Sequence, residues 1–145
     1  LPAKDGVLLS GDGPQSDDWD VLIITRGKRE IEPDSEQFIG QQQSFGKALE
    51  ALQSGQELVA LTWNGRAVAS ALNDHAGRRL ANDAFVNGGR AAGISGSGPA
   101  IIVFISSVTS DSLINATKWY ESRGCSVIKT KVINPPKIEN KEAED

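Results

Sequence analysis

The chain has 145 residues, of which 15 are basic and 19 acidic, so its formal net charge is −4. This length suits one domain that buries a core of its own without metal ions or disulfides. The acidic balance argues against a general nucleic-acid binder, which would carry a basic face. No apolar run approaches the roughly 20 residues that a membrane helix requires, and the first residues lack the pattern of a secretory signal. We therefore expect neither a nucleic-acid partner nor a membrane partner.

The rare residue types set further expectations. Cys125 is the single cysteine, which rules out an internal disulfide and favours a reduced, cytoplasmic setting. His75 is the single histidine, so we expect it on the surface and expect no metal site. The chain begins with Leu1 and contains no methionine, and we expect it to be a processed or excised part of a longer polypeptide.

The first quarter of the chain contains two apolar runs, at 7–10 and 21–25, joined by a loop rich in Gly, Asp, Pro and Ser. This pattern predicts a hairpin over residues 6–25. The second run is continuous rather than alternating, which is typical of a strand covered on both faces. We interpret the basic residues that follow it as solvated loop charges without a role; they are Arg26, Lys28 and Arg29.

The middle of the chain shows apolar residues at helical spacing. The pattern predicts three helices, over about 36–53, 56–72 and 75–86. Asp34 or Ser35 is expected to cap the first helix, and Asn73 or Asp74 the third. The glycines at 55 and 88–89 end the first and third helices in the usual way.

The last third is expected to contain a short strand at 91–94, a β-branched strand at 100–105, a helix begun by Ser110 or Asp111, and a strand at 125–132. Without the first run, the order is β-α-β-β-α-β with an enlarged first helical layer. This order predicts an α+β fold of the ferredoxin-like, split βαβ type, in which helices pack mainly on one face of an antiparallel sheet. We expect this domain to span residues 1–134 and a charged tail to span 135–145.

The glycine-rich stretch GISGSGPAIIVF, residues 93–104, leads directly into the β-branched strand. It is not a Walker A loop, because Pro99-Ala100 stand where Lys-Ser/Thr should be, and it is not a dinucleotide fingerprint, because it leads into a strand. The backbone N–H groups and hydroxyls of Ser95, Gly96, Ser97 and Gly98 could approach an anionic or hydroxylated ligand closely. A tight β-connection with positive φ angles explains the spacing equally well.

The same stretch closely resembles the third conserved motif of the GHMP kinase superfamily, a serine- and glycine-rich loop between a helix and a strand of the C-terminal domain. Within that superfamily the pattern is most similar to the archaeal shikimate kinases. Three segments support the resemblance: NGRAVASAL at 64–72, GGRAAGISGSGP at 88–99 and VIKTKVIN at 127–134. The similarity runs from about residue 6 to 134 and is strongest over 88–104.

The resemblance implies an ATP- and Mg²⁺-dependent kinase that phosphorylates a hydroxyl of shikimate. It implies that Ser95, Gly96, Ser97, Gly98 and Asn64 contact substrate or phosphate. The nucleotide phosphate loop of the superfamily belongs to its N-terminal domain, and nothing in residues 1–145 matches it or the first motif. We therefore expect a C-terminal, substrate-side domain, with the hairpin at its junction to an N-terminal domain of the same polypeptide and with no activity alone.

Several assignments stay open. No catalytic residue or general base is assignable, because the superfamily places its candidates in the other domain. A solvent-facing Asn64 is the alternative to a substrate contact. A homoserine kinase and a non-catalytic ferredoxin-like binding or regulatory module are the competing functions. No role is assigned to the remaining arginines near these segments, and the tryptophans are expected in packing contacts; they are Arg78, Arg79, Arg90, Trp19, Trp63 and Trp119.

Overall fold

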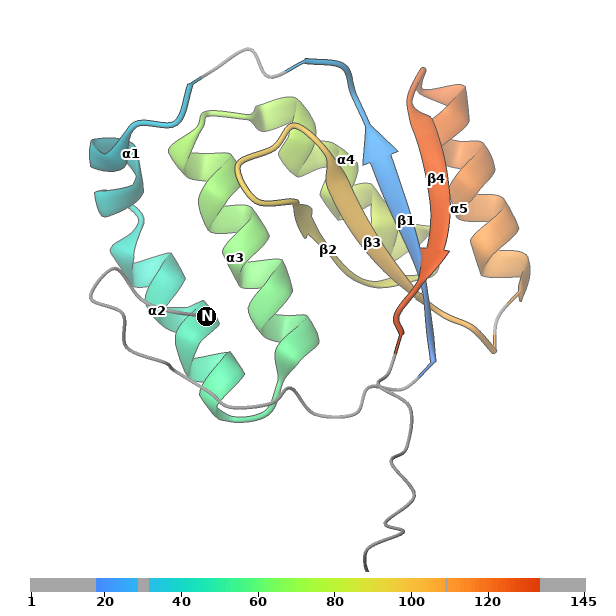
Figure 1. Cartoon of the computed structure of the whole chain (residues 1–145), viewed down its shortest axis with the longest axis horizontal. Helices are drawn as coiled ribbons and strands as arrows, with labels where there is room; N and C mark the ends of the chain where they lie inside the picture. The colour runs from blue at the N-terminus through green and yellow to red at the C-terminus, as the bar shows by residue number, and fades with distance from the viewer. Residues whose placement is uncertain (1–17, 29–31, 109, 134–145) are drawn as a thin grey trace, which may run out of the picture.

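The structure is a computed structural model that describes residues 18–28, 32–108 and 110–133. Within these ranges the chain forms four strands and five helices (Figure 1). The strands are β1 (Trp19–Thr25), β2 (Gly89–Ile94), β3 (Ile101–Ser106) and β4 (Ser126–Lys131). The helices are α1 (Ser35–Ile39), α2 (Gln42–Gln53), α3 (Glu57–Ala71), α4 (His75–Val86) and α5 (Ser110–Ser122). The expected strand at 7–10, Arg29 and the tail at 135–145 lie outside the described residues.

The four strands form one sheet in the order β2-β3-β1-β4, and every neighbouring pair is antiparallel. With helices between β1 and β2 and between β3 and β4, this is the ferredoxin-like, split βαβ arrangement that the sequence pattern predicts. β1 has β3 along one edge and β4 along the other. The hairpin expected over residues 6–25 depends on a first strand that lies outside the described residues, so it stays a prediction.

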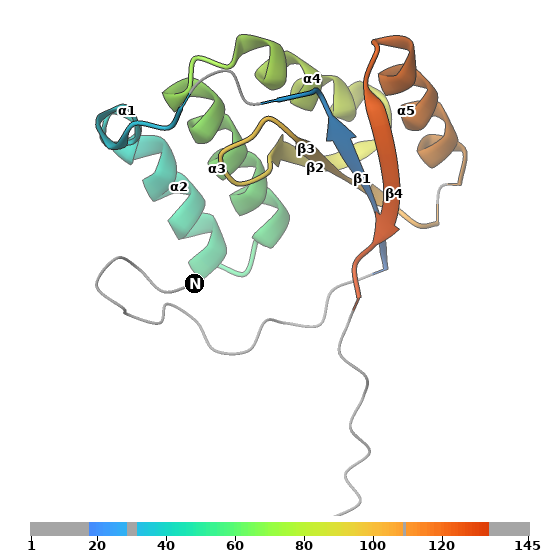
Figure 2. The same cartoon turned by 45° about the horizontal axis from the view of Figure 1, so that its top comes forward.

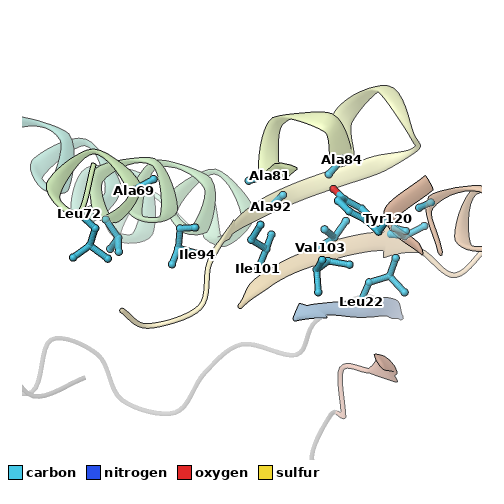
Figure 3. Packing of buried hydrophobic residues seen from close by; sticks show 14 residues of the cluster. Leu22, Ala69, Leu72, Ala81, Ala84, Ala92, Ile94, Ile101, Val103 and Tyr120 are labelled. Atoms are coloured by element: carbon cyan, nitrogen blue, oxygen red, sulfur yellow. The ribbon is translucent and has the colours of Figure 1, made fainter. Parts of the chain in front are cut away.

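Apolar side chains of the central strands build the core on one face of the sheet. Ile101, Val103 and Ile105 are fully buried and alternate with half-buried neighbours, as the period of a strand requires. Leu22 and Ile24 of β1 lie opposite Val103 and Ile101 in the register. Figure 3 shows Tyr120 reaching from α5 toward α4 across this layer, where its hydroxyl donates to the Leu80 carbonyl at 2.7 Å.

The helices occupy two positions around the sheet. α4 and α5 cover the core face, whereas α2 and α3 lie at the β2 edge (Figures 1 and 2). The prediction that both faces of β1 are covered is only partly right, because Val21 is buried but Ile23 is half-buried. None of the helices in the described ranges is long and apolar enough to cross a membrane.

The first predicted helix, 36–53, is two helices in the structure. Gly40 ends α1 by donating its N–H to the carbonyls of Glu36 and Phe38, and α2 begins at Gln42. Glycine is the residue that least favours a continuing helix after proline, which explains the break. Phe38 and Phe45 stack across it with ring centroids 6.1 Å apart. The other predicted helix ends agree with the structure to within one residue, and Asp34 caps α1 as expected.

A contact between two glycines fixes α3 against β2. A Cβ built on Gly65 would overlap the Cα of Gly93 and lie 2.9 Å from the Ile94 nitrogen. Both glycines are buried, so the helix and the strand touch backbone to backbone. Packing of α3 against β2 therefore explains the glycine of the Asn-Gly pair in NGRAVASAL, whether or not a substrate binds nearby.

Candidate functional site

The serine- and glycine-rich loop, residues 95–100, connects β2 to β3 as a tight turn. The Ser95 N–H donates to the Ala100 carbonyl at 2.8 Å, and the Gly98 N–H donates to the Ser95 carbonyl at 2.9 Å. Gly96 and Gly98 have φ angles of +57° and +81°, and the Gly98–Pro99 peptide bond is cis. The expectation of a tight β-connection with positive φ is thus confirmed. The loop joins two strands rather than a helix and a strand.

This geometry limits what the loop can offer to a ligand. Two of the backbone N–H groups expected to face a ligand, those of Ser95 and Gly98, are used within the loop itself. In contrast, the space beside Gly96 is open, because an added Cβ would meet no atom within 4 Å. The backbone at Gly96 is therefore the part of the loop that another molecule or domain can approach most closely.

A hollow of about 1060 Å³ lies beside the loop. The loop contributes Ser97 and Pro99 to its wall, whereas Ser95, Gly96 and Gly98 do not line it. Asn64 is not among the lining residues either and is exposed on α3, as the alternative interpretation expected. The rest of the wall comes from four segments, 25–28, 72–76, 79–80 and 123–126.

Arg26 ties the loop to the start of α4. Its Nε donates to the Pro99 carbonyl at 2.7 Å, and its guanidinium forms a bidentate ion pair with the Asp74 carboxylate. Asp74 also caps α4 by accepting the Gly77 N–H at 2.9 Å. Burial raises the pKa of Asp74, but the hydrogen bonds from Arg26 and Gly77 outweigh it, and the net pKa lies below the ordinary 3.8.

The prediction that Arg26 is a solvated loop charge without a role is therefore wrong. Its side chain is only 14% exposed, and that of Asp74 is 20% exposed, so neither is a solvated surface charge. Asp74 was expected as a helix cap, but the two residues are 48 positions apart and no local pattern connects them. Because Asp74 is held by Arg26 and Gly77, it is a structural carboxylate and a poor candidate for a general base.

The lining of the hollow is cationic. Lys28, Arg79 and Arg123 line it together with Arg26 and His75, and Asp74 is the single carboxylate among the described lining residues. Arg79 thus belongs to the hollow although no role was expected, whereas Arg78 and Arg90 do not line it. His75 is exposed, as expected. This donor set suits an anion and not a metal ion, and no group of three or more His, Cys, Asp or Glu in the described ranges could hold a metal.

Comparisons with known proteins do not assign this chain to a family. No protein-family model matches the chain, and no curated protein matches its sequence. Among solved structures, the homoserine kinase from Cytophaga hutchinsonii is similar, with a TM-score of 0.45 and 14% sequence identity. The match covers 82% of this chain and 42% of that kinase, so this chain spans less than half of its length. A likeness this distant assigns neither a family nor an activity.

Proposed function

We propose that this chain is the C-terminal, substrate-side domain of an ATP-dependent GHMP-type kinase that phosphorylates a hydroxyl group of shikimate. The observation that carries the proposal is the GISGSGP loop, whose sequence resembles the third motif of that superfamily and which forms one wall of a basic hollow. The ferredoxin-like sheet agrees with the fold that the resemblance implies. A hollow of about 1060 Å³ is also large enough for a small metabolite.

The loop residues take different parts in this proposal. Ser97 lines the hollow, so its hydroxyl is the polar side chain through which the loop contacts bound substrate. The open space beside Gly96 admits the transferring phosphate or the facing domain. Ser95 and Gly98 hold the shape of the turn through their N–H groups. Asn64 is proposed as a substrate contact on the resemblance alone.

ATP and Mg²⁺ are the proposed cofactors, and an N-terminal domain of the same polypeptide is the proposed partner. The described residues do not fit Mg²⁺, because Asp74 is the single carboxylate lining the hollow and it is already paired with Arg26. The metal ligands and the general base would therefore come from the N-terminal domain. We also propose a cytoplasmic location, which the free thiol of Cys125 supports.

Phosphoryl transfer measurements test the proposal. A polypeptide that joins the N-terminal domain to this chain should transfer phosphate from ATP to shikimate, whereas the 145-residue chain alone should fold and show no ATP turnover. Transfer to homoserine but not to shikimate would support a GHMP-type kinase and would show that its acceptor is homoserine. Turnover by the 145-residue chain alone would show that the nucleotide site is misplaced, and no transfer to any acceptor would favour a binding or regulatory module.

A further inference from the structure

The positive charge of the hollow is not a consequence of overall composition. The chain as a whole has a net charge of −4, yet Lys28, Arg79 and Arg123 converge on one hollow from three separate segments. None of these three side chains has a carboxylate partner in the part of the chain that the structure describes. All three residues are exposed, and Asp83 lies with Arg79 and Arg123 along a second, neighbouring hollow. Among the described residues that line the large hollow itself, Asp74 is the single carboxylate, and Arg26 already neutralises it.

Arg79 and Arg123 lie at a shared rim. Both residues line the large hollow, and both also line a second hollow of about 610 Å³ between α4 and α5. The guanidinium of Arg123 lies over the Trp119 ring, 4.3 Å from its centroid. Stacking restrains the plane of a guanidinium while leaving its N–H edges available for hydrogen bonds. Arg123 is exposed, and its contact with Trp119 favours one plane of its guanidinium group before any ligand arrives.

We infer that the large hollow is a recognition site for a compact anionic group, a carboxylate or a phosphate, which Arg79 and Arg123 bind from two sides and Lys28 from a third. Guanidinium groups suit this role because their paired N–H donors match two oxygens of a carboxylate or phosphate. Arg26 does not belong to this set, because its charge is paired with Asp74 and three of its N–H groups donate to Asp74 and Pro99. Only the identification of the anion with the acceptor's carboxylate rests on the proposed function.

A matched control for this inference lies on the same helix. Arg78 is the neighbour of Arg79 on α4, but it does not line either hollow. Its Nη1 donates to the Ser70 hydroxyl at 3.3 Å. Arg78→Gln therefore makes the same change of charge as Arg79→Gln, on the same element, without changing the hollow.

Calorimetric titration of the 145-residue chain at constant ionic strength tests the inference, with shikimate and inorganic phosphate as separate probes. We expect at least one probe to bind saturably with a Kd of about 1 mM or tighter. Arg79→Gln and Arg123→Gln should each weaken this binding at least roughly tenfold, as expected for loss of a charged hydrogen-bond donor. Arg78→Gln should change it less than about twofold. Circular dichroism confirms that each variant is folded.

The two probes separate the sources of the anion. Binding of shikimate but not of its uncharged methyl ester supports a carboxylate site, and binding of phosphate alone supports a phosphate site. Absence of saturable binding by both probes would overturn the inference, and so would an equal loss in Arg78→Gln. These outcomes are independent of the kinase assay, because anion binding is read without turnover. A failed kinase assay with intact, Arg79-dependent binding would reject the proposed function alone.

Discussion

Replacing Gly65 by alanine places a methyl group at the point where α3 meets β2. The new Cβ would overlap the Cα of Gly93 and lie 2.9 Å from the Ile94 nitrogen, whereas carbon atoms in contact prefer about 3.5–4.0 Å. All the nearest atoms are backbone atoms, so no side chain can rotate away. The helix has to retreat from the strand by a substantial part of an ångström.

The expected loss of stability is the difference between two opposing effects. Overpacking in a close-packed interior costs typically about 1–3 kcal/mol, and a clash between backbones belongs at the top of that range. Alanine in a helix interior is favoured over glycine by about 1 kcal/mol. The free energy of unfolding of Gly65→Ala should therefore fall by about 2 kcal/mol, which corresponds to roughly 4–8 °C in melting temperature for a domain of this size.

Gly46→Ala is the matched control, because Gly46 lies inside α2 and an added Cβ there would meet no atom within 4 Å. This variant should gain the helix propensity alone and be stabilised by about 1 kcal/mol. Urea denaturation followed by far-ultraviolet circular dichroism measures both variants against the parent chain. A Gly65→Ala protein as stable as the parent, or stabilised like Gly46→Ala, would show that α3 and β2 do not touch at Gly93.

In the intact kinase proposed above, Gly96→Val should reduce turnover or substrate affinity at least tenfold, which corresponds to about 1.4 kcal/mol. A β-branched side chain is strained at the φ of +57° found at this position, and it would fill the open space beside the loop. Steady-state kinetics measure this loss. As a comparison, Ile101→Ala should lower the stability by about 2–5 kcal/mol in melting curves, because Ile101 is fully buried. If Gly96→Val melts early but keeps full turnover, the loop is only a turn. Tyr120 is the single tyrosine, and burial raises the pKa of its phenol above the ordinary 10.0. Because the unfolded chain ionises near pH 10, the stability from this group is fully present below that pH and is lost as the pH rises above it. Ultraviolet absorbance titration should therefore show no ionisation near pH 10 while the fold persists, and ionisation there in the folded protein would contradict the buried position of Tyr120.

Much of the fold is determined by the sequence alone, because it depends on local periodicity. The apolar run at 21–25 and the β-branched run at 100–105 predict the two central strands to within two residues at each end. Asp34 and Asp74 identify the starts of α1 and α4 through ordinary capping chemistry. The resulting element order is enough to predict the antiparallel, ferredoxin-like sheet, because few topologies accommodate it.

The candidate site and the close contacts were decided only by the tertiary structure. Arg26 and Asp74 pair across 48 positions, and Arg79 of α4 shares a rim with Arg123, which follows the end of α5. In the local sequence, the three arginines resemble ordinary surface charges and Asp74 resembles an ordinary helix cap. Their roles arise from distances between segments, which the packing of helices on the sheet sets and which no local period of the chain encodes.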